Sequence, residues 1–215
     1  MVLLSQRRYI KDLLTHTHMS NAKSMLTPIP TSHPLMLNSG TPLCDPSKYH
    51  HVVGSLQYLL IIRPDNAFTV NKLSQYMHCL AIEHWSFVKR LLCYLCGTID
   101  DGSQLYHYSS ISLHVFIYSS LSLHAFYDVD WAGDKNKFCS TKAYVVYLGK
   151  ILISWSFKKQ RTMARSSTEA EYCFVANIVV ELNWLCSLVT NLGIKLPCCP
   201  IIYCENVGVT QLCSN

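Results

Sequence analysis

The order of strand-like and helix-like segments in the second half of the chain most limits how this sequence can fold. From residue 109 onward the pattern changes from helical periodicity to strand-like alternation of apolar and polar residues. The predicted strands are 109–128, 142–149, 151–157 and 201–204, and the predicted helix runs from residue 168 to about residue 192. Consecutive strands followed by a helix and a further strand build a mixed sheet with a helix across it. The sequence therefore predicts an α/β fold for this half.

The first predicted strand contains a tandem repeat. SSISLHVFIY at 109–118 is followed directly by SSLSLHAFYD at 119–128. Such a short period with only two copies indicates a local duplication of one strand, not a solenoid. The first copy ends in Tyr118 and the second in Asp128, so only the second supplies a carboxylate. The first copy is either a redundant edge strand or a disordered insertion, and the sequence does not distinguish the two.

The first half of the chain is predicted to be mainly helical. Ser, Thr and Pro dominate residues 21–46, which indicates a linker or an extended arm. Apolar spacing predicts helices at 5–17, 50–62, 64–80 and 82–96. We therefore expect one domain at 1–118 and a second at 119–215.

Composition restricts the class of protein. Half of the 215 residues are apolar and the net charge is +5, which is compatible with nucleic-acid binding without requiring it. Eleven cysteines are an odd number, and the N-terminus has no apolar stretch of signal-peptide type, so we expect a reducing compartment, cytoplasmic or nuclear. A membrane helix needs roughly 18 or more apolar residues, and Arg63, Lys150 or Glu181 interrupts each candidate. We expect no contact with a membrane.

Three carboxylates lie in three separate predicted elements. Asp128 is late in a strand, Glu171 is in the opening turn of the long helix, and Glu205 follows the last short strand. Mg²⁺ prefers such oxygen ligands, and two divalent ions about 4 Å apart promote phosphodiester hydrolysis. The pattern therefore predicts a site for Mg²⁺ or Mn²⁺.

Each carboxylate also has a purely structural interpretation. Asp128 could open the loop after its strand, and Glu205 could be a turn residue. Thr168 followed by Glu171 has the spacing of a capping box, and Glu169 in the same turn competes for any role of Glu171. None of the three residues decides the matter alone.

A basic segment lies just before the long helix. The stretch KKQRTMAR contributes Lys158, Lys159, Arg161 and Arg165 ahead of a helix N-terminus, which itself attracts phosphate. This is the clearest pattern for nucleic-acid binding in the chain, although a solvated loop has the same composition. The sequence contains no Walker-type loop, GxGxxG or GxSxG, so nucleotide binding of those types and serine hydrolysis have no support.

Taken together, these motifs resemble copia-type retrotransposon Pol polyproteins over nearly the whole chain. LSQRRYIKDLL, SKYHHVVGSLQYLLIIRPDNAFTVNKLSQYMH and EHWSFVKRLLCYLCGTID resemble the C-terminal region of the reverse transcriptase. LHAFYDVDWAGD, STKAYVVYLGK, ISWSFKKQRTMARSSTEAEY and IIYCEN resemble the appended RNase H domain. SSTEAEY and DWAGD are the most specific of these segments.

The resemblance implies an RNase H-like mixed sheet with a flanking helix, preceded by a mainly helical reverse-transcriptase remnant. It implies Mg²⁺-dependent cleavage of the RNA strand of an RNA:DNA hybrid, with the remainder of a Pol polyprotein as a further partner. Asp128 and Glu171 match the family's first two catalytic carboxylates, whereas the family has Asp at the position of Glu205. The fourth carboxylate has no counterpart before Asn215, so we expect a truncated domain. The paired aspartates of the polymerase would lie upstream of Met1, so we expect no polymerase activity.

Two functions remain open at this point. The fragment either retains RNase H activity or is a catalytically inactive remnant that at most binds nucleic acid weakly. A displacement of about 1 Å, such as the extra methylene of Glu205 introduces, can cost on the order of a hundredfold in rate. Neutral residues also replace basic ones of the family at Cys93, Cys96, Phe138 and Cys139, and each lost phosphate contact weakens binding.

Overall fold

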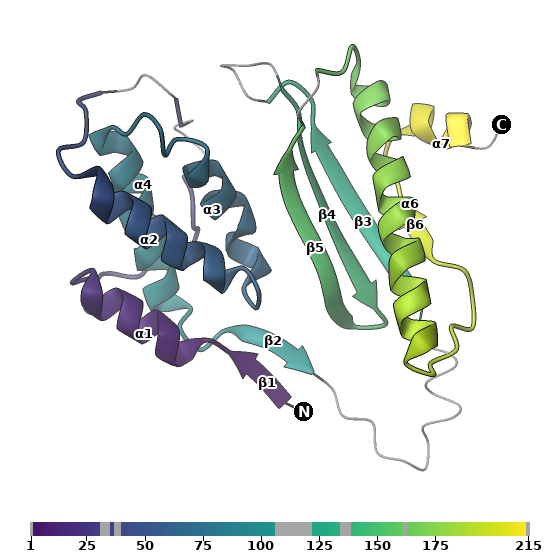
Figure 1. Cartoon of the computed structure of the whole chain (residues 1–215), viewed down its shortest axis with the longest axis horizontal. Coiled ribbons are helices and arrows are strands. Elements are labelled where there is room, and N and C mark those ends of the chain that lie inside the picture. Colours follow the sequence, from purple (N-terminus) through teal and green to yellow (C-terminus); the bar gives the residue numbers. More distant parts are fainter. Residues whose placement is uncertain are drawn as a thin grey trace. The chain divides into compact units, whose positions relative to one another are not determined.

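The computed structural model describes residues 2–30, 35–36, 40–105, 122–133, 139–160 and 163–213. The chain divides into two compact units, Val2–Leu105 and Tyr106–Asn215, which are treated separately (Figure 1). The predicted boundary at residue 118 and the first copy of the repeat, 109–118, lie outside the described residues.

The first unit is mainly helical, as its apolar spacing predicts. Its elements are β1 (Val2–Ser5), α1 (Arg7–His16), α2 (Pro46–Leu59), the 3₁₀ turn η1 (Pro64–Asn66), α3 (Ala67–Ser74), α4 (Ile82–Gly97) and β2 (Gly102–Leu105). β1 pairs antiparallel with β2, so the two ends of the unit lie side by side. Helix α2 begins four residues earlier than predicted because Asp45 caps it, accepting from the backbone N–H groups of Ser47 (3.1 Å) and Lys48 (3.4 Å).

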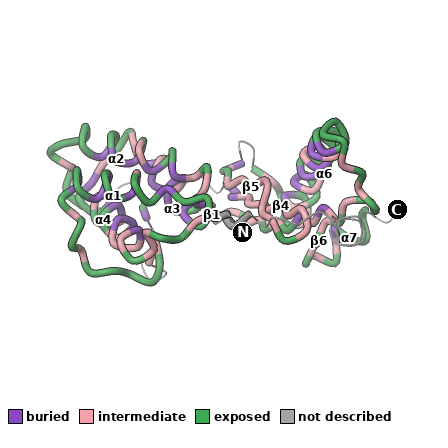
Figure 2. Tube along the Cα trace, turned by 90° about the horizontal axis from the view of Figure 1, so that it is seen from below, coloured by how far each residue is buried: buried purple, intermediate pink, exposed green. Residues whose placement is uncertain are grey.

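The core of the first unit is formed by all four helices. Each contributes apolar side chains that are fully or almost fully buried, for example Leu14 of α1, Leu56 of α2, Leu73 of α3 and Leu91 of α4. Figure 2 shows buried stretches along these helices. The described part of the predicted linker at 21–46 has no helix or strand before α2, yet it packs on this unit, since Thr27 Oγ1 accepts a hydrogen bond from Arg90 at 2.8 Å.

The second unit contains the predicted mixed sheet. Its elements are β3 (Leu123–Asp130), β4 (Thr141–Leu148), β5 (Ile151–Lys159), α6 (Ser167–Asn191), β6 (Ile201–Tyr203) and α7 (Val207–Cys213). The strand order is β5-β4-β3-β6 (Figure 1). β3–β4 and β4–β5 are antiparallel, whereas β6 is parallel to β3. The predicted α/β class with strands, a helix and a further strand is thereby confirmed.

Helix α6 covers one face of this sheet. Two odd-numbered residues of β3, Leu123 and Ala125, are fully buried. They share a core with Val146 of β4 and with Phe174 and Ile178 of α6. Even-numbered residues of β3 point to the opposite face, where Phe126 stacks on Tyr203 with ring centroids 4.5 Å apart. Alternation along β3 therefore decides which of its side chains enter the core and which stay accessible.

Helix α6 is also long and apolar enough to cross a membrane by length and composition, which the sequence analysis did not expect. Only 28% of its most apolar window is buried. Ile178 and Leu182 pack in the core of the sheet, and Glu181 accepts a hydrogen bond from Ser154 of β5 at 2.8 Å. These contacts are those of a core helix of an α/β unit.

Candidate functional site

Asp128 lies near the end of the central strand β3, on the face opposite α6. β3 is flanked by β4 and β6, and Asp128 pairs in register with Ala143. Its neighbours Tyr127 and Val129 contact the core beneath α6, while Asp128 itself is exposed. The strand therefore presents the carboxylate to solvent at its C-terminal end.

Glu205 leaves the sheet at the same edge. β6 is parallel to β3, with Tyr203 opposite Phe126. Asp128 is two residues beyond Phe126, and Glu205 is two residues beyond Tyr203. The carboxyl ends of adjacent parallel strands meet at one edge, so both carboxylates lie there. Glu205 is also exposed.

Glu171 is free of the capping role that its sequence position suggested. α6 begins at Ser167, one residue earlier than the predicted start, and Ser166 is its N-cap, accepting from Glu169 N at 3.1 Å. Glu169 Oε2 in turn accepts from Arg165 N at 2.8 Å. The N-cap is therefore Ser166, with Glu169 holding the residue before it, and the predicted capping box of Thr168 with Glu171 is wrong. Glu169, the alternative to Glu171 for a functional role, therefore has a structural role at the helix start.

Glu171 instead contacts the residue that follows Glu205. Asn206 Nδ2 donates a hydrogen bond to Glu171 Oε1 at 3.0 Å. Asn206 Oδ1 accepts from the backbone N–H of Gly208 at 2.9 Å and of Val209 at 3.4 Å, so the same side chain begins α7. The start of α6 and the end of β6 are thus joined by one amide.

Tyr127 connects the remaining pair of elements. Its hydroxyl donates to Cys204 Sγ at 2.8 Å, and Tyr127 precedes Asp128 as Cys204 precedes Glu205. Burial raises the pKa of Tyr127 above its usual range, and the Cys204 thiol and the charge of Glu171 act in the same direction. The sequence neighbours of the carboxylates therefore contact each other where β3, β6 and α6 meet.

The carboxylates themselves are not gathered into a ready metal site. Within the part of the chain that the structure describes, no group of three or more His, Cys, Asp or Glu side chains could hold a metal ion. The elements that carry Asp128, Glu171 and Glu205 meet at one edge of the sheet, but shared ligation by the three side chains stays a prediction.

The described basic residues lie at this edge as well. Lys158 pairs in register with Lys142 of β4, and Lys142 pairs with Val129 of β3. Lys158 therefore lies in the same row of the sheet as Val129, the residue after Asp128. Lys158 and Arg165 are exposed, Lys159 ends β5, and Arg161 lies outside the described residues. Their contact with nucleic acid stays a prediction.

Lys142 is a basic residue near this edge, on the face that α6 covers, and sequence reasoning missed it. Its ammonium lies 5.0 Å from the ring centroid of Phe174 on α6. Burial lowers the pKa of Lys142, and the positive charge of Lys158 acts in the same direction. Only the strand register reveals this pairing, because the two lysines are far apart in the sequence.

The loop after β3 is fixed against the segment before α6. Trp131 Nε1 donates to the backbone oxygen of Ala164 at 3.2 Å. Ala132 has a positive φ of 53°, a backbone conformation that is costly for a residue with a Cβ. A Cβ on Gly133 would meet the carboxylate of Asp130, so a larger residue there would require that exposed side chain to move. Residues 130–133, the described part of the DWAGD motif, therefore form a turn that is held against the segment before α6.

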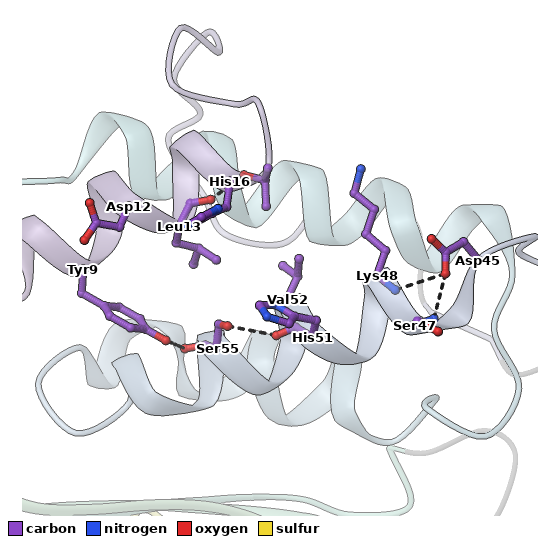
Figure 3. Close-up of a pocket in the computed structure, with 11 residues that line it drawn as sticks. Tyr9, Asp12, Leu13, His16, Asp45, Ser47, Lys48, His51, Val52 and Ser55 are labelled. Carbon is purple, nitrogen blue, oxygen red and sulfur yellow. Dashed lines mark hydrogen bonds between the residues drawn. The ribbon is translucent and has the colours of Figure 1, made fainter.

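A separate cavity of about 690 Å³ lies between α1 and α2 in the first unit. Tyr9, Asp12, His16, Lys48 and His51 are among its lining residues (Figure 3). Tyr9 Oη donates to the backbone oxygen of Ser55 at 3.0 Å across it. None of the predicted site residues lines this cavity.

Comparison with known proteins identifies the family. The chain is 53% identical over 212 residues to a retrovirus-related Pol polyprotein from transposon RE2, and 52% identical over 212 residues to one from transposon RE1, both of Arabidopsis thaliana. Each alignment covers 99% of this chain. An uncharacterized mitochondrial protein of the same plant is 39% identical over 186 residues, which are 85% of this chain and 72% of that protein.

The chain belongs to the retrovirus-related Pol polyproteins of transposons. This confirms the predicted relationship, and the copia type is consistent with these relatives. The chain spans 14% of the length of the two Pol polyproteins that it matches best among these three. No family model matches the sequence, and no solved structure matches it.

Proposed function

We propose that the second unit is an RNase H-like domain of a copia-type Pol polyprotein and cleaves the RNA strand of an RNA:DNA hybrid. One observation carries the proposal. Asp128 and Glu205 leave adjacent parallel strands at one edge, and Glu171 is hydrogen-bonded at 3.0 Å to the residue after Glu205. Three carboxylates that are distant in sequence thus belong to elements that meet.

The donor chemistry fits a hard divalent cation. Asp128, Glu171 and Glu205 would hold Mg²⁺ or Mn²⁺ through carboxylate oxygens, the ligands that these ions prefer. When bound, such an ion polarises the phosphate and lowers the pKa of the attacking water. Carboxylates repel one another when no cation is present, so a group of three is not expected to gather beforehand.

The other residues of the edge would bind and orient the substrate. Lys158 and Arg165 are exposed at the same edge of the sheet as the carboxylates and would contact backbone phosphates, which gives affinity without sequence preference. Asp128, held by the central strand, would keep its carboxylate fixed relative to the scissile phosphate. The hydrogen bond of Trp131 to Ala164 would keep the loop after β3 and the segment before α6 together during binding.

Cleavage of a labelled RNA:DNA hybrid in Mg²⁺ or Mn²⁺ tests the proposal. The unmodified chain is compared with Asp128→Asn and with the matched control Asp130→Asn, which changes a carboxylate on the same face of the same strand. We expect cleavage that Asp128→Asn abolishes and that Asp130→Asn largely retains. Equal activity of all three proteins would indicate a contaminating nuclease, and no cleavage by folded protein would reject the enzyme.

A catalytically inactive remnant that at most binds nucleic acid weakly is the second candidate. Glu205 in place of the aspartate that the resemblance implies favours this candidate. Hybrid binding without cleavage would support this candidate. In either case we infer that the remainder of a Pol polyprotein is the natural partner.

A further inference from the structure

We propose that Asn206 is a positioning residue for Glu171, an inference that rests on the proposed function. Asn206 is the only described side chain shown donating a hydrogen bond to the Glu171 carboxylate. Asn206 would not touch the substrate. It would set where one oxygen of Glu171 lies and leave the other oxygen to face the ion.

The amide of Asn206 is fixed at both ends. Its oxygen accepts from the backbone N–H groups of Gly208 (2.9 Å) and Val209 (3.4 Å), the second and third residues of α7. A carboxamide is planar, so once its oxygen is held by the helix start, the direction of its NH₂ group is determined. That group points at Glu171 Oε1, 3.0 Å away.

The backbone of Asn206 is anchored too. Its carbonyl oxygen accepts from Thr210 N at 3.2 Å and from Cys204 Sγ at 3.4 Å. Cys204 Sγ itself accepts from Tyr127 Oη of β3 at 2.8 Å. A hydrogen-bond chain therefore leads from the strand of Asp128, through the end of β6, to Glu171. These contacts connect the strand that carries Asp128 to the Glu171 carboxylate.

This arrangement has a consequence for metal affinity. A glutamate side chain has several rotatable bonds, and ordering it costs conformational entropy. A partner that holds the ligand beforehand reduces that cost, and loss of such a partner typically weakens metal affinity or activity about 10- to 100-fold. The competing interpretation is that Asn206 only caps α7, for which Asn is among the preferred residues.

Asn206→Ser separates the two roles. Serine is also a preferred N-cap, so α7 keeps an acceptor for its first N–H groups. The serine hydroxyl is too short to donate to Glu171. We would measure Mn²⁺ dissociation constants by electron paramagnetic resonance of free Mn²⁺ for the full chain, Asn206→Ser, Glu171→Gln and the double variant, with thermal unfolding of each as the check of folding.

We expect Asn206→Ser to weaken Mn²⁺ binding about 10- to 100-fold without a comparable loss of thermal stability. In the Glu171→Gln background the same change should have little further effect, because the two residues act through one contact. Equal weakening in both backgrounds would mean that Asn206 acts through the fold and not through Glu171. Unchanged binding in Asn206→Ser would overturn the positioning role and leave the proposed function intact.

A metal-free measurement tests the contact itself. In a ¹H–¹⁵N spectrum, the side-chain amide signals of Asn206 should shift in Glu171→Gln and stay in place in the control Glu181→Gln. Failure to shift would overturn the inference whatever the metal data show. If they shift but the unmodified chain neither binds Mn²⁺ nor cleaves hybrid, the proposed function fails, and Asn206 is reduced to a structural cap.

Discussion

Arg63 shows at the scale of a residue how this chain compensates a buried charge. Only 2% of its surface is exposed, and its guanidinium makes a bidentate pair with Asp65 at 3.0 and 2.7 Å. It also donates to the backbone oxygen and hydroxyl of Thr98, both at 2.8 Å. Burial alone would lower the pKa of Arg63, but Asp65, together with Tyr94 and Asp101, outweighs burial and raises it. The network ties the turn after α2 to the end of α4.

Arg63→Lys should therefore destabilise the first unit by about 2–4 kcal/mol, because lysine cannot reproduce the planar set of donors in a buried site. Arg7→Lys is the matched control, since Arg7 pairs with Asp100 at 2.9 Å on the surface and its change should cost about 0–1 kcal/mol. Urea unfolding of both variants is the measurement. Equal midpoints would contradict the role assigned to the buried network.

Glu205→Asp is the second prediction at this scale. The substitution retracts the carboxylate by one methylene and restores the residue that the resemblance implies. If the site forms as proposed, metal-dependent cleavage of hybrid should rise, by up to about a hundredfold. The measurement is the initial rate at saturating Mg²⁺. An unchanged or lower rate would argue against ligation by this position.

At the scale of elements, the sequence predicts segments well where the signal is local. Asp45 followed by Pro46 is a local signal for a helix start, and it predicts the observed start of α2 better than apolar spacing does. α3 ends at Ser74, whereas the predicted helix extends to Leu80, because residues after Ser74 make tertiary contacts instead of continuing the helix. The Tyr76 hydroxyl donates to Leu35 O at 2.9 Å, and its ring stacks on His84. No sequence window contains partners that distant.

The start of α6 provides a test at this scale. Loss of the Ser166 cap in Ser166→Ala should destabilise the second unit by about 1 kcal/mol. Thr168→Ala is the control, and about 0.5 kcal/mol or less is expected because its side chain caps nothing in this structure. Thermal or urea unfolding distinguishes the two. A larger loss in Thr168→Ala would restore the capping box that the sequence analysis expected.

The candidate site shows the same limit of prediction. Asp128 and Glu205 could be placed at strand ends from alternation alone, and parallel pairing then brings them to one edge. Asn206 and Lys142 were missed, since their contacts join residues far apart in the sequence. Asn206 did carry a local signal, as an N-cap residue before a short apolar helix.

At the scale of the whole molecule, the two units have separate cores, and all predicted functional residues belong to the second. Lys158 and Arg165 lie at the carboxylate edge, whereas Lys150 lies in the turn between β4 and β5 at the other end of the sheet. Nucleic acid should therefore follow the carboxylate edge of the second unit.

Salt dependence of hybrid binding tests this placement. Lys158→Gln and Arg165→Gln should each make the slope of log K against log[salt] less negative by about 0.7–0.9, the loss of one phosphate contact. Lys150→Gln should leave the slope unchanged. A salt-independent affinity of the unmodified chain would mean that phosphates are not contacted.

The most direct test of the account is whether the three carboxylates share one divalent-ion site. Mn²⁺ is titrated into the ¹⁵N-labelled chain, and paramagnetic broadening of the backbone amide signals is followed. We predict that the signals of Asp128, Glu171 and Glu205 broaden together at one Mn²⁺ concentration, while that of Gly149 in the β4–β5 turn remains sharp. Broadening at only one of the three, or at none of them, would contradict the shared site.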